Sequence, residues 1–67
     1  MGSVARITNI SARSEQSFDD AVRVGIERAN ATLRNVQGAW VKDQKVEVEG
    51  GNITVFQVAL EVTFVLE

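Results

Sequence analysis

Residues 53–67 read Ile-Thr-Val-Phe-Gln-Val-Ala-Leu-Glu-Val-Thr-Phe-Val-Leu-Glu, and their alternation decides the fold of this chain. One set of alternate positions is wholly apolar and comprises Phe56, Val58, Leu60, Val62, Phe64 and Leu66. The other set is mixed and comprises Ile53, Val55, Gln57, Ala59, Glu61, Thr63 and Val65. Because successive side chains of a strand point to opposite faces, this pattern predicts a β-strand whose apolar face lies in a core.

The sheet face that carries the second set, called the mixed face below, is too apolar for water and too polar for a core. A chain of 67 residues has little else to lay over it. We therefore expect the mixed face to meet another subunit or a ligand, and expect the function to lie there.

Size and composition favour the same conclusion. A single domain this small is marginally stable alone, and its sequence contains neither cysteine nor histidine to form disulfides or the usual zinc sites. Oligomerisation is the support that remains. The net charge of −2, without a basic stripe or a long apolar run, argues against nucleic-acid and membrane partners. The lack of cysteine and of a signal-peptide pattern predicts a cytoplasmic protein.

Upstream of the C-terminal strand, the sequence predicts a short strand, a connection and one helix. The strand covers residues 4–10 and the polar connection covers residues 11–16. Ser17 begins the helix as an N-cap, with Asp20 three residues later in a capping-box-like pair. Asn35 and Gly38 are its predicted stop signals. The apolar stripe of the helix comprises Phe18, Ala21, Val22, Gly25, Ile26, Ala29, Leu33 and Val36.

A second long strand is predicted over residues 39–49, followed by a hairpin turn at Gly50-Gly51. That turn pairs Glu49 with Asn52 and sets the register of the two strands. Counting back from it, the predicted pairs on the mixed face are Val48–Ile53, Val46–Val55, Gln44–Gln57, Lys42–Ala59 and Trp40–Glu61. The opposite face pairs Val41 with Leu60 and Ala39 with Val62. The order strand, helix, strand, strand predicts a single α+β domain over residues 1–67, with one helix against an antiparallel sheet.

The mixed face contains two groups of residues with different expected roles. Val46, Val48, Ile53 and Val55 form an apolar cluster near the hairpin, which we expect to be a subunit contact. The second group comprises Trp40, Lys42, Gln44, Gln57 and Glu61. An indole beside amides can hold a planar heteroaromatic ring, by stacking and by hydrogen bonds to its edge. A tryptophan packed at a subunit interface is the alternative.

Catalysis and metal binding have weaker support. The sequence has no histidine or cysteine, no serine in a nucleophile setting and no phosphate-binding glycine loop. Asp43, Glu47, Glu49 and Asn52 supply oxygen atoms near the hairpin, but without the spacing of an EF-hand. We interpret them as solvated charges, with a calcium site as the alternative, and expect no enzyme activity.

Several segments together resemble the dodecin family over nearly the whole chain. They are Ser17-Phe-Asp-Asp-Ala-Val-Arg-Val-Gly-Ile-Glu-Arg-Ala, Thr32-Leu-Arg-Asn-Val, Val41-Lys-Asp-Gln and Phe56-Gln-Val-Ala-Leu-Glu-Val-Thr-Phe-Val-Leu. The resemblance implies a β-α-β-β fold in which a three-stranded antiparallel sheet wraps around one helix. It also implies a hollow homododecamer with 23 symmetry, which stores or sequesters flavins such as riboflavin or FMN. In such proteins, pairs of flavin rings stack between tryptophans of symmetry-related subunits.

The resemblance assigns roles to particular residues. Gln57 matches the glutamine that holds the polar edge of the flavin ring. The stacking tryptophan of the family stands where this chain has Gly38, whereas Trp40 lies two residues further on, about 6.6 Å along the same face. Lys45 occupies the position of an arginine associated with the ligand phosphate, and Val65 that of a second arginine. The resulting candidate ligand-binding residues are Gln57, Trp40, Gly38, Gln44 and Lys45. The alternative is a flavin-independent dodecin-like assembly, whose pocket Trp40 closes and which binds a cation or another small molecule.

Overall fold

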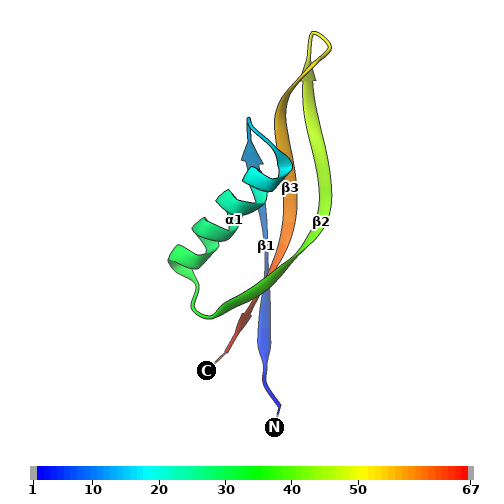
Figure 1. Ribbon diagram of the computed structural model, residues 1–67. Helices are drawn as coiled ribbons and strands as arrows, with labels where there is room; N and C mark the ends of the chain where they lie inside the picture. The colour runs from blue at the N-terminus through cyan, green and yellow to red at the C-terminus, as the bar shows by residue number, and fades with distance from the viewer. Residues whose placement is uncertain (1, 67) are drawn as a thin grey trace.

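A computed structural model describes residues 2–66 and shows one helix against one face of an antiparallel sheet (Figure 1). The order of strands in the sheet is β1-β3-β2, so the C-terminal strand lies in the centre. The predicted β-α-β-β order is therefore confirmed. The elements are β1 (Ala5–Ser14), α1 (Phe18–Thr32), β2 (Val36–Glu49) and β3 (Asn52–Val65).

The core lies between α1 and the apolar face of β3. Val58, Leu60 and Val62 are at most 1% exposed, and Ala21 and Ala29 of the helix pack against them. The mixed face is the face turned away from α1, and no other element within residues 2–66 covers it. Both results agree with the alternation of residues 53–67.

Gly25 lets the helix approach the sheet closely. A Cβ added at this position would lie 2.9 Å from Leu60 Cδ1 and 3.0 Å from Ala12 Cβ. Real Cβ atoms are almost never that close to a neighbour, so only glycine fits without movement. The close approach offsets the roughly 1 kcal/mol of helix propensity that glycine costs relative to alanine.

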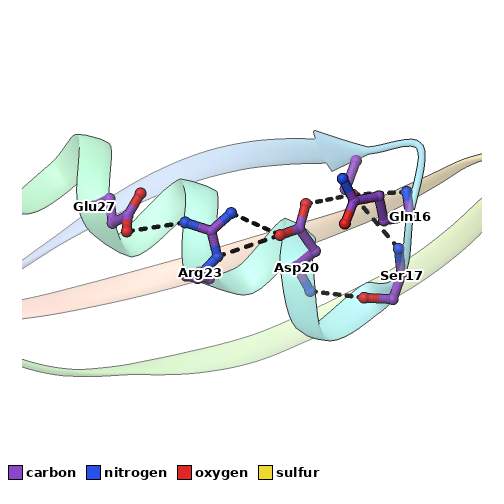
Figure 2. A network of polar contacts seen from close by, with 6 residues as sticks. Gln16, Ser17, Asp20, Arg23 and Glu27 are labelled. Atoms are coloured by element: carbon purple, nitrogen blue, oxygen red, sulfur yellow. Dashed lines mark hydrogen bonds and ion pairs between the residues drawn. The ribbon is translucent and has the colours of Figure 1, made fainter.

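A network of polar contacts fixes the start of α1 (Figure 2). The backbone N–H of Asp20 donates to Ser17 Oγ at 2.9 Å, which confirms the predicted N-cap. The Ser14 hydroxyl donates to Asp20 Oδ2 at 2.7 Å, and its oxygen accepts from the Gln16 N–H at 2.9 Å. Arg23 contacts Asp20 at 2.7 Å and Glu27 at 2.9 Å. The hydrogen bonds from Ser14 and Arg23 hold the pKa of Asp20 below its ordinary value.

The predicted end of β1, the predicted end of α1 and the predicted start of β2 at residue 39 are wrong. The connection expected over residues 11–16 is largely strand, because β1 continues to Ser14 and buries Ala12 and Ser14. The helix ends at Thr32, before the predicted stop at Asn35, and Val36 begins β2 instead of completing the apolar stripe. Asn35 has a φ of 59°, which marks the change of direction between the two elements.

The hairpin joining β2 and β3 has the predicted turn and the predicted register next to it. Gly50 and Gly51 have φ values of 57° and 83°, a conformation that favours glycine. The register is also as predicted toward the other end of β2, opposite Trp40. Pairs that keep the predicted register are Glu49–Asn52, Val48–Ile53, Val41–Leu60, Trp40–Glu61 and Ala39–Val62.

Between these ends, the register of β2 against β3 differs by one residue from the predicted register. Irregularities fall between Glu47 and Val48, where β3 has an extra residue, and between Val41 and Asp43, where β2 has one. The two shifts cancel, so only the segment between them is displaced. The pairs there are Glu47–Val55, Val46–Phe56, Lys45–Gln57, Gln44–Val58 and Asp43–Ala59.

A shift of one residue exchanges the two faces of a strand. Gln44 and Val46 therefore lie on the side of α1, and Lys45 and Glu47 lie on the mixed face. The predicted apolar cluster is divided, because Val55 pairs with Glu47 while the other three residues, Val46, Val48 and Ile53, share the helix side. These three are exposed beyond the end of the helix, where the hairpin extends alone (Figure 1). Within residues 2–66, the one helix is too short and too polar to cross a membrane.

Candidate functional site

Gln57 lies at the centre of a row of polar side chains across the mixed face. Its register partners are Arg13 on β1 and Lys45 on β2. Directly opposite residues of antiparallel strands share a face, so both cations flank the carboxamide. Gln57 is only partly exposed. A glutamine so placed supplies one acceptor and two donor hydrogens to a ligand lying on the sheet.

A shallow hollow of about 220 Å³ borders Gln57. Asp43, Gln44, Lys45, Gln57 and Ala59 line it. Gln44 pairs with Val58 and not with Gln57, so the two amides predicted to act side by side have register partners on opposite faces. Lys45, by contrast, is directly opposite Gln57. A hollow this shallow encloses a ring system only if a second subunit covers it.

Trp40 is a large, mostly exposed aromatic side chain on the mixed face. It is 67% exposed and pairs with Glu61, as predicted. Lys42 lies with its Nζ 5.5 Å from the centre of the Trp40 ring and 3.9 Å from Glu61 Oε1. The indole thus has a cation near it within the chain and a large area left open for another molecule.

Gly38 lies next to Trp40 along the strand, two residues toward the helix end of β2. Its register partner is Thr63, and a Cβ added there would meet nothing within 4 Å. The position is therefore open, and no contact within the described part of the chain requires glycine at it. Trp40 is four β3 residues from Gln57, about 13 Å, whereas Gly38 is six residues away, about 20 Å.

An ion pair beside Gln57 was missed by the sequence analysis. Arg13 Nη2 lies 2.7 Å from Glu47 Oε2, so the pair reaches from β1 to β2 across the central strand. Arg13 had been assigned to a connection and Glu47 had been placed on the other face. The signal that could have found the pair is the strand-like alternation of Ile10, Ala12 and Ser14, which places Arg13 beside Gln57.

A larger groove than the hollow beside Gln57 lies elsewhere. It has a volume of about 620 Å³ and lies between α1 and β1, with Ile10, Val24, Arg28 and Leu33 among its lining residues. It contains none of the candidate ligand-binding residues. Among residues 2–66, no three acidic side chains come close enough together to hold a metal ion. Asp43, Glu47 and Glu49, which supply oxygen atoms near the hairpin, form no such group.

The comparisons with known proteins agree with the resemblance seen in the sequence. The family model described as Dodecin matches residues 4–67. A curated dodecin of Thermus thermophilus is 31% identical, and the match covers 100% of this chain and 97% of that protein. The solved dodecin of Streptomyces davaonensis superposes with a TM-score of 0.93 at 33% identity, covering 100% of this chain and 98% of the other.

A more distant relative has a different stated ligand. It is a calcium-chelating antigen of Mycobacterium tuberculosis, called calcium dodecin and described with a novel calcium-binding site. Its structure superposes with a TM-score of 0.82 at 27% identity, covering 97% of this chain and 93% of the other. Fold, length and sequence together show that this chain belongs to the dodecin family.

Proposed function

We propose that this protein is a non-catalytic flavin-binding dodecin that stores or sequesters riboflavin or FMN in a hollow homododecamer. The observation that carries the proposal is that Trp40, 67% exposed, shares an uncovered sheet face with Gln57. Family membership supports small-molecule binding in a dodecamer. We propose a cytoplasmic location, and a second copy of the chain as the main macromolecular partner.

The residues on the mixed face fit a flavin in two respects. The indole of Trp40 offers an open surface for stacking, and the carboxamide of Gln57 offers both a donor and an acceptor to the polar edge of the ring. The flavin supplies the heterocycle, and the protein makes and breaks no bond. Its contribution is to cover the ring, which excludes solvent.

The site is incomplete within one chain. Trp40 and Gln57 are about 13 Å apart along β3, and the hollow next to Gln57 is shallow. We therefore propose that the ring touches Gln57 of one subunit and Trp40 of another. Gly38, where the family has its stacking tryptophan, leaves room for this displaced indole because no side chain fills its position.

A second candidate function is a dodecin-like assembly that does not bind flavin. It is favoured by the position of Lys42, which lies over the ring of Trp40 and near Glu61, so that one side of the indole already has a partner. In this alternative, Trp40 packs against another subunit and closes the pocket. A cation bound by such a shell requires carboxylates from several subunits, since residues 2–66 hold no acidic cluster.

Titration of the protein into riboflavin and FMN, followed by flavin fluorescence, tests the proposal. Strong quenching at micromolar protein is expected, and unchanged emission at tens of micromolar would favour the second candidate. Gln57→Leu removes the edge contact and should weaken binding at least about tenfold, since it removes a pair of hydrogen bonds to the ligand. Gln16→Leu is the matched control, because Gln16 lies in the connection between β1 and α1, does not line the hollow, and should leave affinity within about twofold.

A further inference from the structure

Two of the three cations near Gln57 on the mixed face lie against carboxylates. Arg13 contacts Glu47 at 2.7 Å, and Lys42 lies 3.9 Å from Glu61. The remaining cation, Lys45, is on the same strand and the same face as Asp43, two residues away. The mixed face between Trp40 and Glu47 thus carries as many carboxylates as cations, and it offers no excess positive charge to an anion.

The pair between Arg13 and Glu47 has the largest consequence for a ligand. Arginine binds phosphate through two parallel N–H groups, a geometry that lysine lacks. Glu47 occupies the Nη2 donor of the Arg13 guanidinium and adds a negative charge at the same place. With side chains 55% and 43% exposed, the pair contributes little to folding stability, so its main effect is on the local potential.

We infer that Glu47 makes this face select an uncharged flavin, riboflavin, over its phosphate ester FMN. The inference rests on the proposed function, since it concerns the specificity of the same site. Riboflavin and FMN share the ring that Trp40 and Gln57 contact, and they differ in a terminal phosphate of about −1.5 to −2 charges at pH 7. The ratio of their dissociation constants therefore reports the potential beside the ring.

The size of the effect follows from Coulomb's law. Removing one negative charge about 10 Å from a doubly charged phosphate changes the affinity for FMN by roughly fourfold in a surrounding as polar as water, and by more where the site is enclosed. The change should shrink as salt is added, because screening at 0.1 M is already strong at about 10 Å.

The experiment compares the ratio of the FMN and riboflavin dissociation constants in four proteins: wild type, Glu47→Gln, Arg13→Gln and the double variant. The wild type should bind riboflavin more tightly than FMN. In Glu47→Gln the ratio should fall by about fourfold or more at low salt, and the double variant should return it close to the wild-type value. Arg13→Gln alone should raise the ratio, because it leaves Glu47 without its cation.

Two results would overturn the inference, and they are distinguishable. A wild type that prefers FMN, or a ratio that Glu47→Gln leaves unchanged, would refute the role of Glu47 and leave flavin binding in place. If neither flavin binds to the wild type, the proposed function fails and the inference fails with it.

Discussion

Replacing Trp40 by alanine separates the roles proposed for the mixed face. The indole is 67% exposed, and its contact within the chain is with Lys42, at 5.5 Å from the ring centre. An exposed cation–π contact contributes about 0.5–1 kcal/mol, so the substitution should hardly affect the folding stability of the single chain. Any larger effect must therefore come from a ligand or from another subunit.

The two roles predict different losses. Stacking of a flavin on Trp40 resembles base–aromatic stacking, for which truncation costs about 1–3 kcal/mol, or roughly 5- to 150-fold in the dissociation constant. In that case the oligomer should persist. A tryptophan that anchors a subunit contact behaves as a hot spot, and its loss costs about 2 kcal/mol or more of assembly free energy.

Two measurements on the same sample decide between them: quenching of flavin fluorescence and mass photometry at one protein concentration. Lys42→Ala is the matched control, because it removes the cation and keeps the indole, and it should change affinity by less than about fivefold. If the Trp40→Ala protein assembles and binds flavin like the wild type, the reasoning is refuted, because the indole exposed in the single chain is then covered neither by a ligand nor by another subunit. If the wild type does not bind flavin, Gly38→Trp combined with Trp40→Glu should restore binding, provided that the displaced indole is the cause.

The packing, the helix start and the hairpin give three further predictions. Gly25→Ala should lower the urea midpoint by the equivalent of about 1 kcal/mol, since overpacking of about 1–3 kcal/mol outweighs the helix propensity gained. Gly38→Ala is the control, because a Cβ at that position meets no neighbour. A raised midpoint for Gly25→Ala would contradict the close helix–sheet contact. The free energy of unfolding should decrease as pH falls below 3.8, the ordinary pKa of Asp20, because the pKa of Asp20 is lower in the folded state and the unfolded state takes up the proton first. In urea melts at a series of pH values, Asp20→Asn should reduce this dependence of the unfolding free energy on pH. A pH dependence that Asp20→Asn leaves unchanged would argue against the network at the start of α1. Ile53→Glu should reduce the fraction of assembled protein in sedimentation, because it places a charge at an exposed apolar position of the hairpin. Ile53→Val should leave that fraction unchanged. Equal assembly of both variants would show that Ile53 does not contribute to a subunit interface.

Local signals in the sequence predicted the parts of the fold that depend on neighbouring residues. The alternation of residues 53–67 located the central strand, Ser17 located the start of the helix, and Gly50-Gly51 fixed the turn. Ser14 was misread because a polar residue between a strand and a helix is typical of a connection. In the structure its hydroxyl is buried and bonded to Asp20, so a tertiary contact decides where β1 ends.

The candidate site could be predicted only in part, for a reason that lies in the register. Trp40 is where the sequence placed it, opposite Glu61, because the two irregularities between the hairpin turn and Trp40 cancel. The segment between the two irregularities could not be predicted, because a bulge has no reliable sequence signature. A register shift of one residue exchanges the two faces of that segment. The exchange makes Lys45 instead of Gln44 the register partner of Gln57 and brings Glu47 to the same face. The heteroaromatic contact thus follows from the sequence pattern, while the charges that would discriminate between flavins depend on two bulges that only the folded hairpin reveals.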